Sequence, residues 1–192
     1  MDEPDRDESP LGGIDAEIRE LLGLFDVPAF ARRGQELEYS LVRLRTRCLR
    51  QRATLLEMVQ LRLRQWAAAS PGPEAEARHF RAPIAPLWAL VGAEPPPRRG
   101  DRWASSWRLR AIARDLAASV ERFNRRWADY LEGLDLGPIN RQVADYNRYY
   151  LLEKECSLGS ARLAARHFVP KEEVTLDDLR AEMPPLPVPE PI

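Results

Sequence analysis

The sequence is poor in the residues that build metal, disulfide and nucleophilic sites, with two cysteines and two histidines among 192 residues. Cys48 and Cys156 stand at no motif spacing, so they are interpreted as small buried side chains, with a disulfide between them as the alternative. His79 and His167 have no second ligand at the spacing of HExxH or CxxC. We therefore expect no catalytic residue, no metal and no cofactor, and we predict that the protein is not an enzyme.

Long apolar runs are also missing, and so is a secretion signal. No stretch of about 18 apolar residues occurs, so no membrane-spanning helix is expected. The first residues, MDEPDRDESPLGG, are acidic and contain neither the basic region nor the apolar region of a signal peptide. A cytoplasmic location is the simplest expectation.

Lysine is nearly absent, because only Lys154 and Lys171 accompany the arginines in a total of 29 basic residues. A GC-rich genome that favours arginine codons is one explanation, and selection for arginine chemistry is the other. The formal net charge of -1 conceals a segregation of charge, since residues 1–20 are strongly acidic and residues 28–69 are strongly basic. Arginine-rich faces and acidic ends are therefore candidate contact surfaces.

Helical periodicity is abundant. Residues 28–69 contain no proline after the first position, and their apolar side chains form one stripe on a helical wheel. The same spacing recurs at 101–132 and at 138–168. The stripe of the first helix consists of Leu37, Leu41, Leu44, Cys48, Leu55, Val59, Leu63 and Trp66. The sequence therefore predicts an all-α bundle of three long helices, each of which buries its stripe against the others.

The remaining segments complete the predicted domain organisation. Residues 1–12 are expected to be a disordered acidic start, which a short helix follows. A single helical-bundle domain is predicted over 13–169, with a proline-rich strap at 70–100 between the first two long helices. We interpret the strap as packed on the bundle, with a binding loop as the alternative. The acidic, proline-rich tail at 170–192 either lies along the bundle or binds a groove on a partner.

Two arginines interrupt the apolar stripe of the first helix. Arg45 and Arg52 lie inside it, where an unpaired guanidinium would cost several kcal/mol. Measured from the helix starts, Glu153 in the third helix lies at a height similar to that of Arg45. We predict a buried ion pair between Glu153 and one of these arginines. Glu153 is also the best acid–base candidate, but a structural role is preferred.

Candidate interaction residues lie on the polar sides of the first two long helices. Trp103 and Trp107 are four residues apart on one side of the second helix, away from its apolar face. Either the strap covers them, or they form an exposed aromatic pair beside arginines, the composition of an interface hot spot. The polar face of the first helix adds the basic candidates Arg43, Arg47 and Arg50.

Two stretches resemble a known family. YSLVRLR in the first helix and INRQVADYNR in the third resemble, in that order, stretches of LemA-like helical proteins, whose long helices carry similar Leu-Arg and Tyr-Asn runs. The transmembrane start expected of that family has no counterpart in this sequence. The resemblance implies long helices and brings no functional residue with it.

These features predict a helical adaptor or structural subunit without enzymatic activity. It is expected to bind a protein partner through its arginine-rich faces, its aromatic pair or its terminal tails. The alternative is binding of nucleic acid or another polyanion by the arginine-rich helix faces. This alternative comes second because the acidic ends could satisfy the arginines internally.

Overall fold

A computed structural model gives the structure of the protein for residues 27–69, 72–95, 104–155 and 170–192. Within these ranges the side chains are described except at 27–31 and 149–155. The acidic start predicted at 1–12, and the short helix predicted after it, lie outside the described residues.

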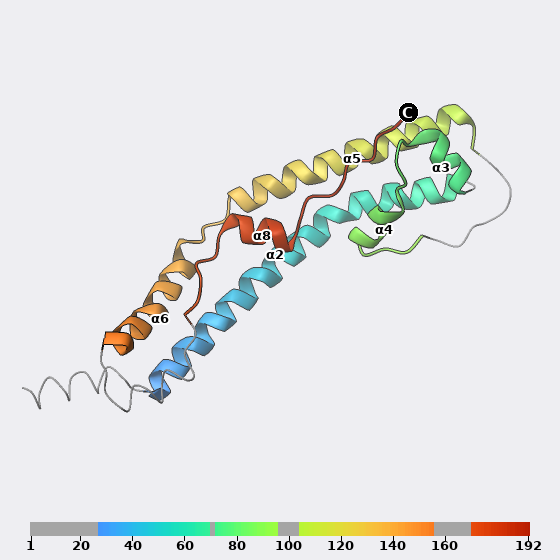
Figure 1. Cartoon of the computed structure of the whole chain (residues 1–192). Helices are drawn as coiled ribbons and strands as arrows, with labels where there is room; N and C mark the ends of the chain where they lie inside the picture. Colours follow the sequence, from blue (N-terminus) through green and yellow to red (C-terminus); the bar gives the residue numbers. More distant parts are fainter. Residues whose placement is uncertain (1–26, 70–71, 96–103, 156–169) are drawn as a thin grey trace, which may run out of the picture. The chain divides into compact units, whose positions relative to one another are not determined.

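The described residues form helices and no strand, which confirms the all-α class (Figure 1). The helices are α2 (Val27–Ala69), α3 (Pro73–His79), α4 (Ala85–Leu90), α5 (Ser106–Glu132), α6 (Gly137–Glu155) and α8 (Leu176–Glu182). The predicted long helices correspond to α2, α5 and α6, although residues 156–168 of the third lie outside the described part. None of the helices in the described ranges is long and apolar enough to cross a bilayer. The packing of all three around one seam stays a prediction.

The described residues divide into two compact units. Unit 1 contains α2 up to Arg43 and the described residues of Leu136–Glu173. Unit 2 contains Leu44–Asp135 and Val174–Ile192. Residues of the predicted tail thus contribute to the packing of each unit.

The core of unit 2 is built from the apolar stripes of α2 and α5. Cys48, Val59 and Leu63 of α2 have no exposed surface, and neither have Leu116 and Val120 of α5. Complete burial of such side chains stabilises a fold by about 1.5–3 kcal/mol each for the valines and leucines. Cys48 is therefore a small buried side chain, as predicted, whereas Cys156 lies outside the described residues.

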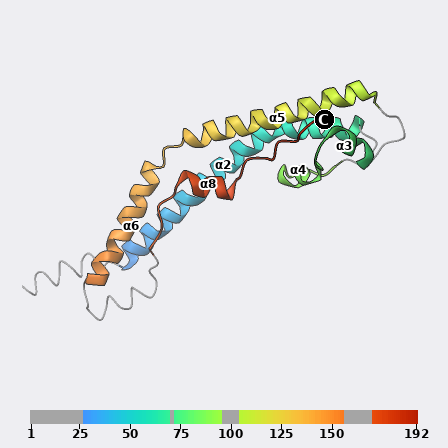
Figure 2. The ribbon, with the colours of Figure 1, turned by 45° about the horizontal axis from the view of Figure 1, so that its top comes forward.

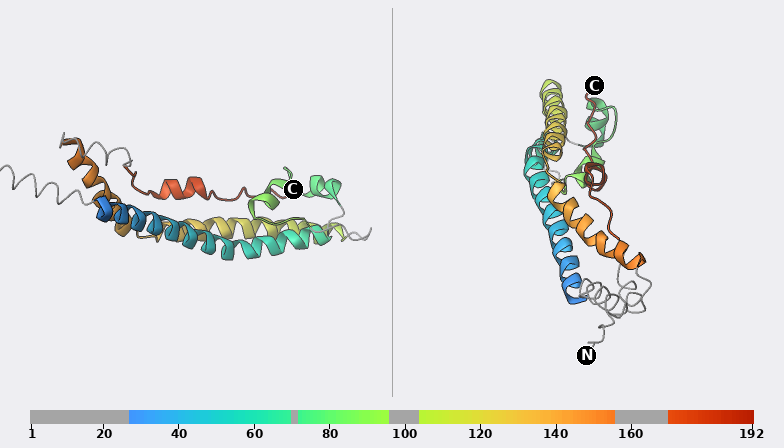
Figure 3. Two further views of the ribbon diagram at one scale, coloured as in Figure 1. Left: turned by 90° about the horizontal axis from the view of Figure 1, so that it is seen from below. Right: turned by 90° about the vertical axis from the view of Figure 1, so that its left-hand side faces the viewer.

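The strap between α2 and α5 packs against unit 2. Figure 2 and the left view of Figure 3 show α3, α4 and α8 on one face of the pair formed by α2 and α5. The ring of Trp66 on α2 meets that of Phe80 edge to face, with 4.9 Å between centroids. Gln60 donates a hydrogen bond of 2.8 Å to the carbonyl of Val91 at the end of α4. Because Ile84 and Leu87 are also buried, the described part of the strap, residues 72–95, is a packed element with two short helices.

Unit 1 pairs the first part of α2 with α6. Tyr146 of α6 is buried against Gly34, where an added Cβ would lie 3.4 Å from the tyrosine ring. This burial raises the pKa of Tyr146. The side-chain amide of Asn147 donates to the carbonyl of Lys171 at 2.7 Å and accepts from its N–H at 2.9 Å. The ammonium of Lys171 in turn forms an ion pair with Glu38.

Candidate interaction surfaces

Both arginines that interrupt the stripe of α2 have partners in the C-terminal segment of unit 2, residues Val174–Ile192. Arg45 donates from Nε and Nη2 to the Glu182 carboxylate, with the shortest bond at 2.8 Å. This pair lies at the surface, since the side chain of Arg45 is 52% exposed and that of Glu182 is 42% exposed. Arg52 is buried and donates from Nη1 to the carbonyl of Met183 at 3.1 Å. The side chain of Glu153 is not described, so the predicted pair with Glu153 stays a prediction.

The cation of Arg52 is surrounded by rings and a carbonyl. Its guanidinium carbon lies 5.2 Å from the ring centroid of Phe123 and 5.5 Å from that of Trp127, both on α5. Trp127 also donates from Nε1 to the carbonyl of Met183, at 3.0 Å, so this one oxygen accepts from both helices. Burial lowers the pKa of Arg52. Cation–π contact and a carbonyl acceptor therefore take the place of a carboxylate.

Asn124 on α5 holds the C-terminal segment by its backbone. Its side-chain amide donates to the carbonyl of Leu186 and accepts from the N–H of Leu186, at 2.8 Å each. Further along, the N–H of Arg81 donates to the carbonyl of Glu190, and the N–H of Ile192 donates to the carbonyl of His79, both at 3.0 Å. In each of these hydrogen bonds, the segment contributes a main-chain N–H or carbonyl group and no side-chain atom.

Apolar side chains anchor the same segment. Leu179 on α8, Met183 and Leu186 are all buried, with at most 5% of their surface exposed. Val188, two positions after Leu186, is by contrast 40% exposed. The tail thus lies along the helices of unit 2, which was one of the two predicted alternatives. Sequence reasoning missed Asn124, because a single asparagine at the margin of an apolar stripe has no motif around it.

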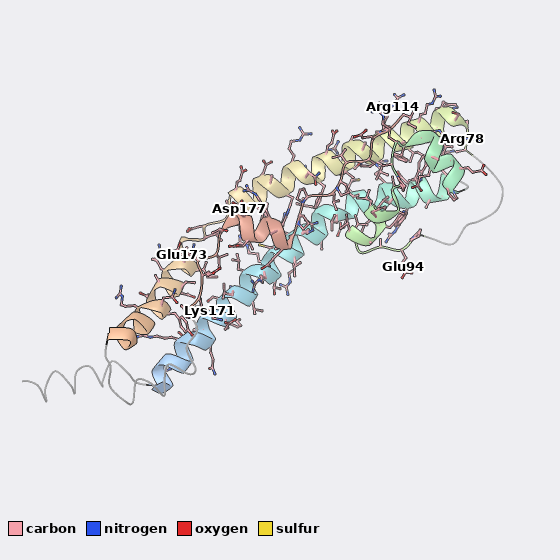
Figure 4. The ribbon with its side chains drawn as sticks, in the orientation of Figure 1. Arg78, Glu94, Arg114, Lys171, Glu173 and Asp177 are labelled. Atoms are coloured by element: carbon pink, nitrogen blue, oxygen red, sulfur yellow. The ribbon has the colours of Figure 1, made fainter. Side chains whose placement is uncertain are left out.

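A second surface lies on the side of α5 that faces away from the core. Trp107, Arg114 and Arg125 fall within about 20° of one another on the helical wheel, opposite the buried Leu116. Figure 4 shows Arg114 on the side of α5 away from α2. We call this surface the α5 outer face, and its members are Trp107, Arg110, Ala111, Arg114, Ala118, Glu121 and Arg125, all exposed.

Trp107 is the most exposed large apolar side chain of the α5 outer face, at 74% of its surface. The described residues of the strap leave it exposed, so of the two alternatives the exposed one applies to Trp107, and the favoured interpretation, coverage by the strap, is wrong for this side chain. Trp103 lies outside the described residues. Among the residues that the structure describes, Arg110, Arg114 and Arg125 form no ion pair. With three arginines against Glu121, the α5 outer face is a mainly basic strip with one aromatic side chain, and it extends over about 27 Å at 1.5 Å per residue.

The basic candidates on α2 are also exposed. Arg43, Arg47 and Arg50 all have exposed side chains. In unit 2, α2 also exposes Leu49, Met58 and Leu61, at 46–56% of their surfaces. Burial raises the pKa of the neighbouring Cys48 thiol, so this cysteine has no raised nucleophilicity.

Hollows in unit 2 offer little chemistry. One of about 530 Å³ lies between α2 and α5 and is lined by Arg62, Gln65, Arg108 and Asp115 among others. Two of these lining residues form an ion pair, with 3.8 Å between Arg62 Nη1 and Asp115 Oδ2. Within the described ranges, no group of three or more histidine, cysteine, aspartate and glutamate residues could hold a metal ion.

Comparisons of the chain with protein-family models, with curated proteins and with solved structures give no match. The resemblance to LemA-like helical proteins therefore stays a prediction.

Proposed function

We propose that the protein is a non-enzymatic helical adaptor in the cytoplasm that binds an acidic protein partner through the α5 outer face. The observation that carries this proposal is the exposure of Trp107, at 74%, on a helix face whose arginines form no ion pair with described residues. Tryptophan and arginine are the residue types most enriched at binding hot spots. A single exposed aromatic ring flanked by guanidinium groups offers both apolar area and charge to a partner.

The sign of the partner follows from the charges of α5. The helix carries six arginines against four acidic residues. Two of those acids are already engaged, because Asp115 pairs with Arg62 and Glu132 pairs with Arg180. The charge that α5 presents outward is therefore mainly positive, and complementary potentials favour an acidic surface. The basic residues Arg43, Arg47 and Arg50 on α2 are the second candidate surface of this adaptor.

A cross-linking experiment tests the proposal. A photo-activatable phenylalanine analogue at position 107 should cross-link one discrete acidic protein in extracts of the native cell. The same analogue at position 78, an exposed arginine of α3, is the matched control. Arg114→Glu together with Arg125→Glu should lower the yield roughly tenfold or more, since each hot-spot change costs about 2 kcal/mol. Equal yields from positions 107 and 78 would contradict the proposal.

Binding of nucleic acid or another polyanion is the second candidate. The exposed arginines of the α5 outer face favour it, because they form no ion pair with a described residue and phosphate contacts come mainly from arginine and lysine. Retention on heparin or DNA would fall steeply with added salt, by a slope of about -0.9 per phosphate contact in a log–log plot. Loss of that retention in the variant with Arg110, Arg114 and Arg125 changed to glutamate would place this candidate first. Equal retention of the unchanged chain and of this variant would exclude polyanion binding by the α5 outer face.

A further inference from the structure

The C-terminal segment of unit 2 is bound in the way that a receptor binds an extended peptide. Residues 184–190 form neither helix nor strand, and prolines occupy positions 184, 185, 187, 189 and 191. Proline fixes φ and removes an N–H, so the free segment loses little conformational freedom on docking. The last residues make one antiparallel bridge, between Phe80 and Pro191.

The docking face of this segment consists of Arg52, Asn124, Trp127, His79 and Arg81. It contacts the main chain at four residues of the segment: Met183, Leu186, Glu190 and Ile192. Arg52 and Trp127 both donate to Met183, and Asn124 satisfies both backbone groups of Leu186. Because main-chain groups are common to all sequences, this recognition does not depend on the residues between the anchors.

Specificity for a sequence comes mainly from two buried side chains, because the ion pair of Arg81 with Glu190, at 3.5 Å, is exposed and adds little. Met183 and Leu186 are 5% and 3% exposed, whereas the residues between and after them, Pro184, Pro185, Pro187 and Val188, are exposed. The docking face thus selects two large apolar side chains three positions apart. It tolerates variation at the other positions of an extended chain.

We propose that the docking face is a binding site for an extended, proline-containing peptide with two large apolar residues three positions apart, and that the chain's own C-terminal segment competes for it. The site uses residues distinct from those of the α5 outer face, so the proposal stands independently of the adaptor function. A tethered segment competes at an effective concentration in the millimolar range. A partner peptide therefore binds when the segment opens locally, or when its own anchors fit better.

The test uses the full chain and a fluorescent peptide that copies residues 174–192. Met183→Asp together with Leu186→Asp in the chain weakens the internal segment and should increase peptide affinity at least about tenfold over the unchanged chain. Adding Asn124→Ala should reverse most of that gain, because the amide pair with Leu186 is lost. Arg126→Ala, at an exposed position of the same helix outside both surfaces, is the matched control and should leave affinity unchanged. A peptide that carries both aspartates should not bind.

Two results overturn the proposal. One is a doubly substituted chain that keeps its helix content and cooperative unfolding but binds the peptide no better than the unchanged chain. The other is a peptide affinity of the doubly substituted chain that stays the same when Asn124→Ala is added. If the doubly substituted chain does not fold, hydrogen exchange of the unchanged chain decides the question. The amides of Leu186 and Ile192 should exchange at least about tenfold faster than that of Val120 in α5. Equal protection at the three amides means that the segment opens only with global unfolding, which overturns the proposal.

Discussion

Asn124 and Leu186 form a closed amide-to-amide pair across unit 2, with two hydrogen bonds of 2.8 Å. The asparagine belongs to α5 and the leucine to the C-terminal segment, 62 residues later in the chain. Asn147 and Lys171 form the same kind of pair in unit 1, at 2.7 and 2.9 Å. In each unit, a helix thus holds an extended segment through one asparagine side chain.

Replacement of Asn124 by alanine should lower the free energy of unfolding by about 1–3 kcal/mol, because both part-buried backbone groups of Leu186 lose their partner. Chemical unfolding followed by circular dichroism measures the change. Arg125→Ala, at an exposed neighbouring position, should change the same quantity by no more than about 0.5 kcal/mol. Equal effects of the two substitutions would contradict this account of the segment.

Arg52 contributes more through its buried stem than through its charge. Arg52→Met keeps an apolar chain of similar length and removes a desolvated cation, so stability should change by less than about 1 kcal/mol. The carbonyl of Met183 keeps its hydrogen bond from Trp127 in this variant. Arg52→Ala leaves a cavity beside Phe123 and should cost about 2–4 kcal/mol. Thermal unfolding of the two variants distinguishes packing from charge, and equal losses would indicate that the charge matters most.

The start of α8 gives a pH-dependent contribution to stability. The hydroxyl and N–H of Thr175 donate to the Asp178 carboxylate, which lowers the pKa of that carboxyl below its ordinary value. Because the pKa in the folded state is lowered, the stabilisation is present above the ordinary pKa and is lost as the pH falls through the lowered one. Thr175→Ala should raise the pKa of Asp178 toward its ordinary value, measured by NMR titration of the carboxyl carbon.

Thr175→Ser is the control for this capping interaction, since serine keeps the hydroxyl that accepts from the N–H of Asp178. The stability gap between the alanine and serine variants should narrow at acidic pH. A gap that stays constant over that range would show that the carboxylate has no part in the capping.

Replacement by alanine should change the free energy of unfolding far less at Trp107 than at Trp127. Trp107→Ala should change the free energy of unfolding by no more than about 0.5 kcal/mol, because the ring is 74% exposed. Trp127→Ala should cost about 3–5 kcal/mol, because the ring is 2% exposed and fills the core. Urea unfolding of both variants measures the difference. A destabilisation of more than about 1 kcal/mol by Trp107→Ala would mean that the ring is structural and would weaken its assignment to an interaction surface.

Most of the fold that could be predicted from the sequence was predicted from helical periodicity. Both ends of α2, the last residue of α5 and the burial of Cys48, Val59, Leu63 and Leu116 follow from apolar side chains at helical spacing, whereas α5 begins at Ser106 and not at the predicted residue 101. That spacing is a local property, because it depends only on the rotation per residue. The partner of Arg52 did not follow from it. A wheel shows that a charge lies on an apolar face, but it does not show which distant segment covers that face.

The sequence by itself determined the all-α class, the amphipathic faces of the long helices and the extended character of the C-terminal segment, since each depends on neighbouring residues. Only the tertiary structure decided that this segment lies on unit 2, that Arg45 pairs with Glu182 and that Trp107 stays exposed. The physical reason is that these contacts join residues far apart in the chain, as with Arg45 and Glu182, which are 137 positions apart. A hydrogen bond to a main-chain carbonyl, such as that of Arg52 to Met183, cannot be predicted from a pattern of side chains, because every residue has such a carbonyl.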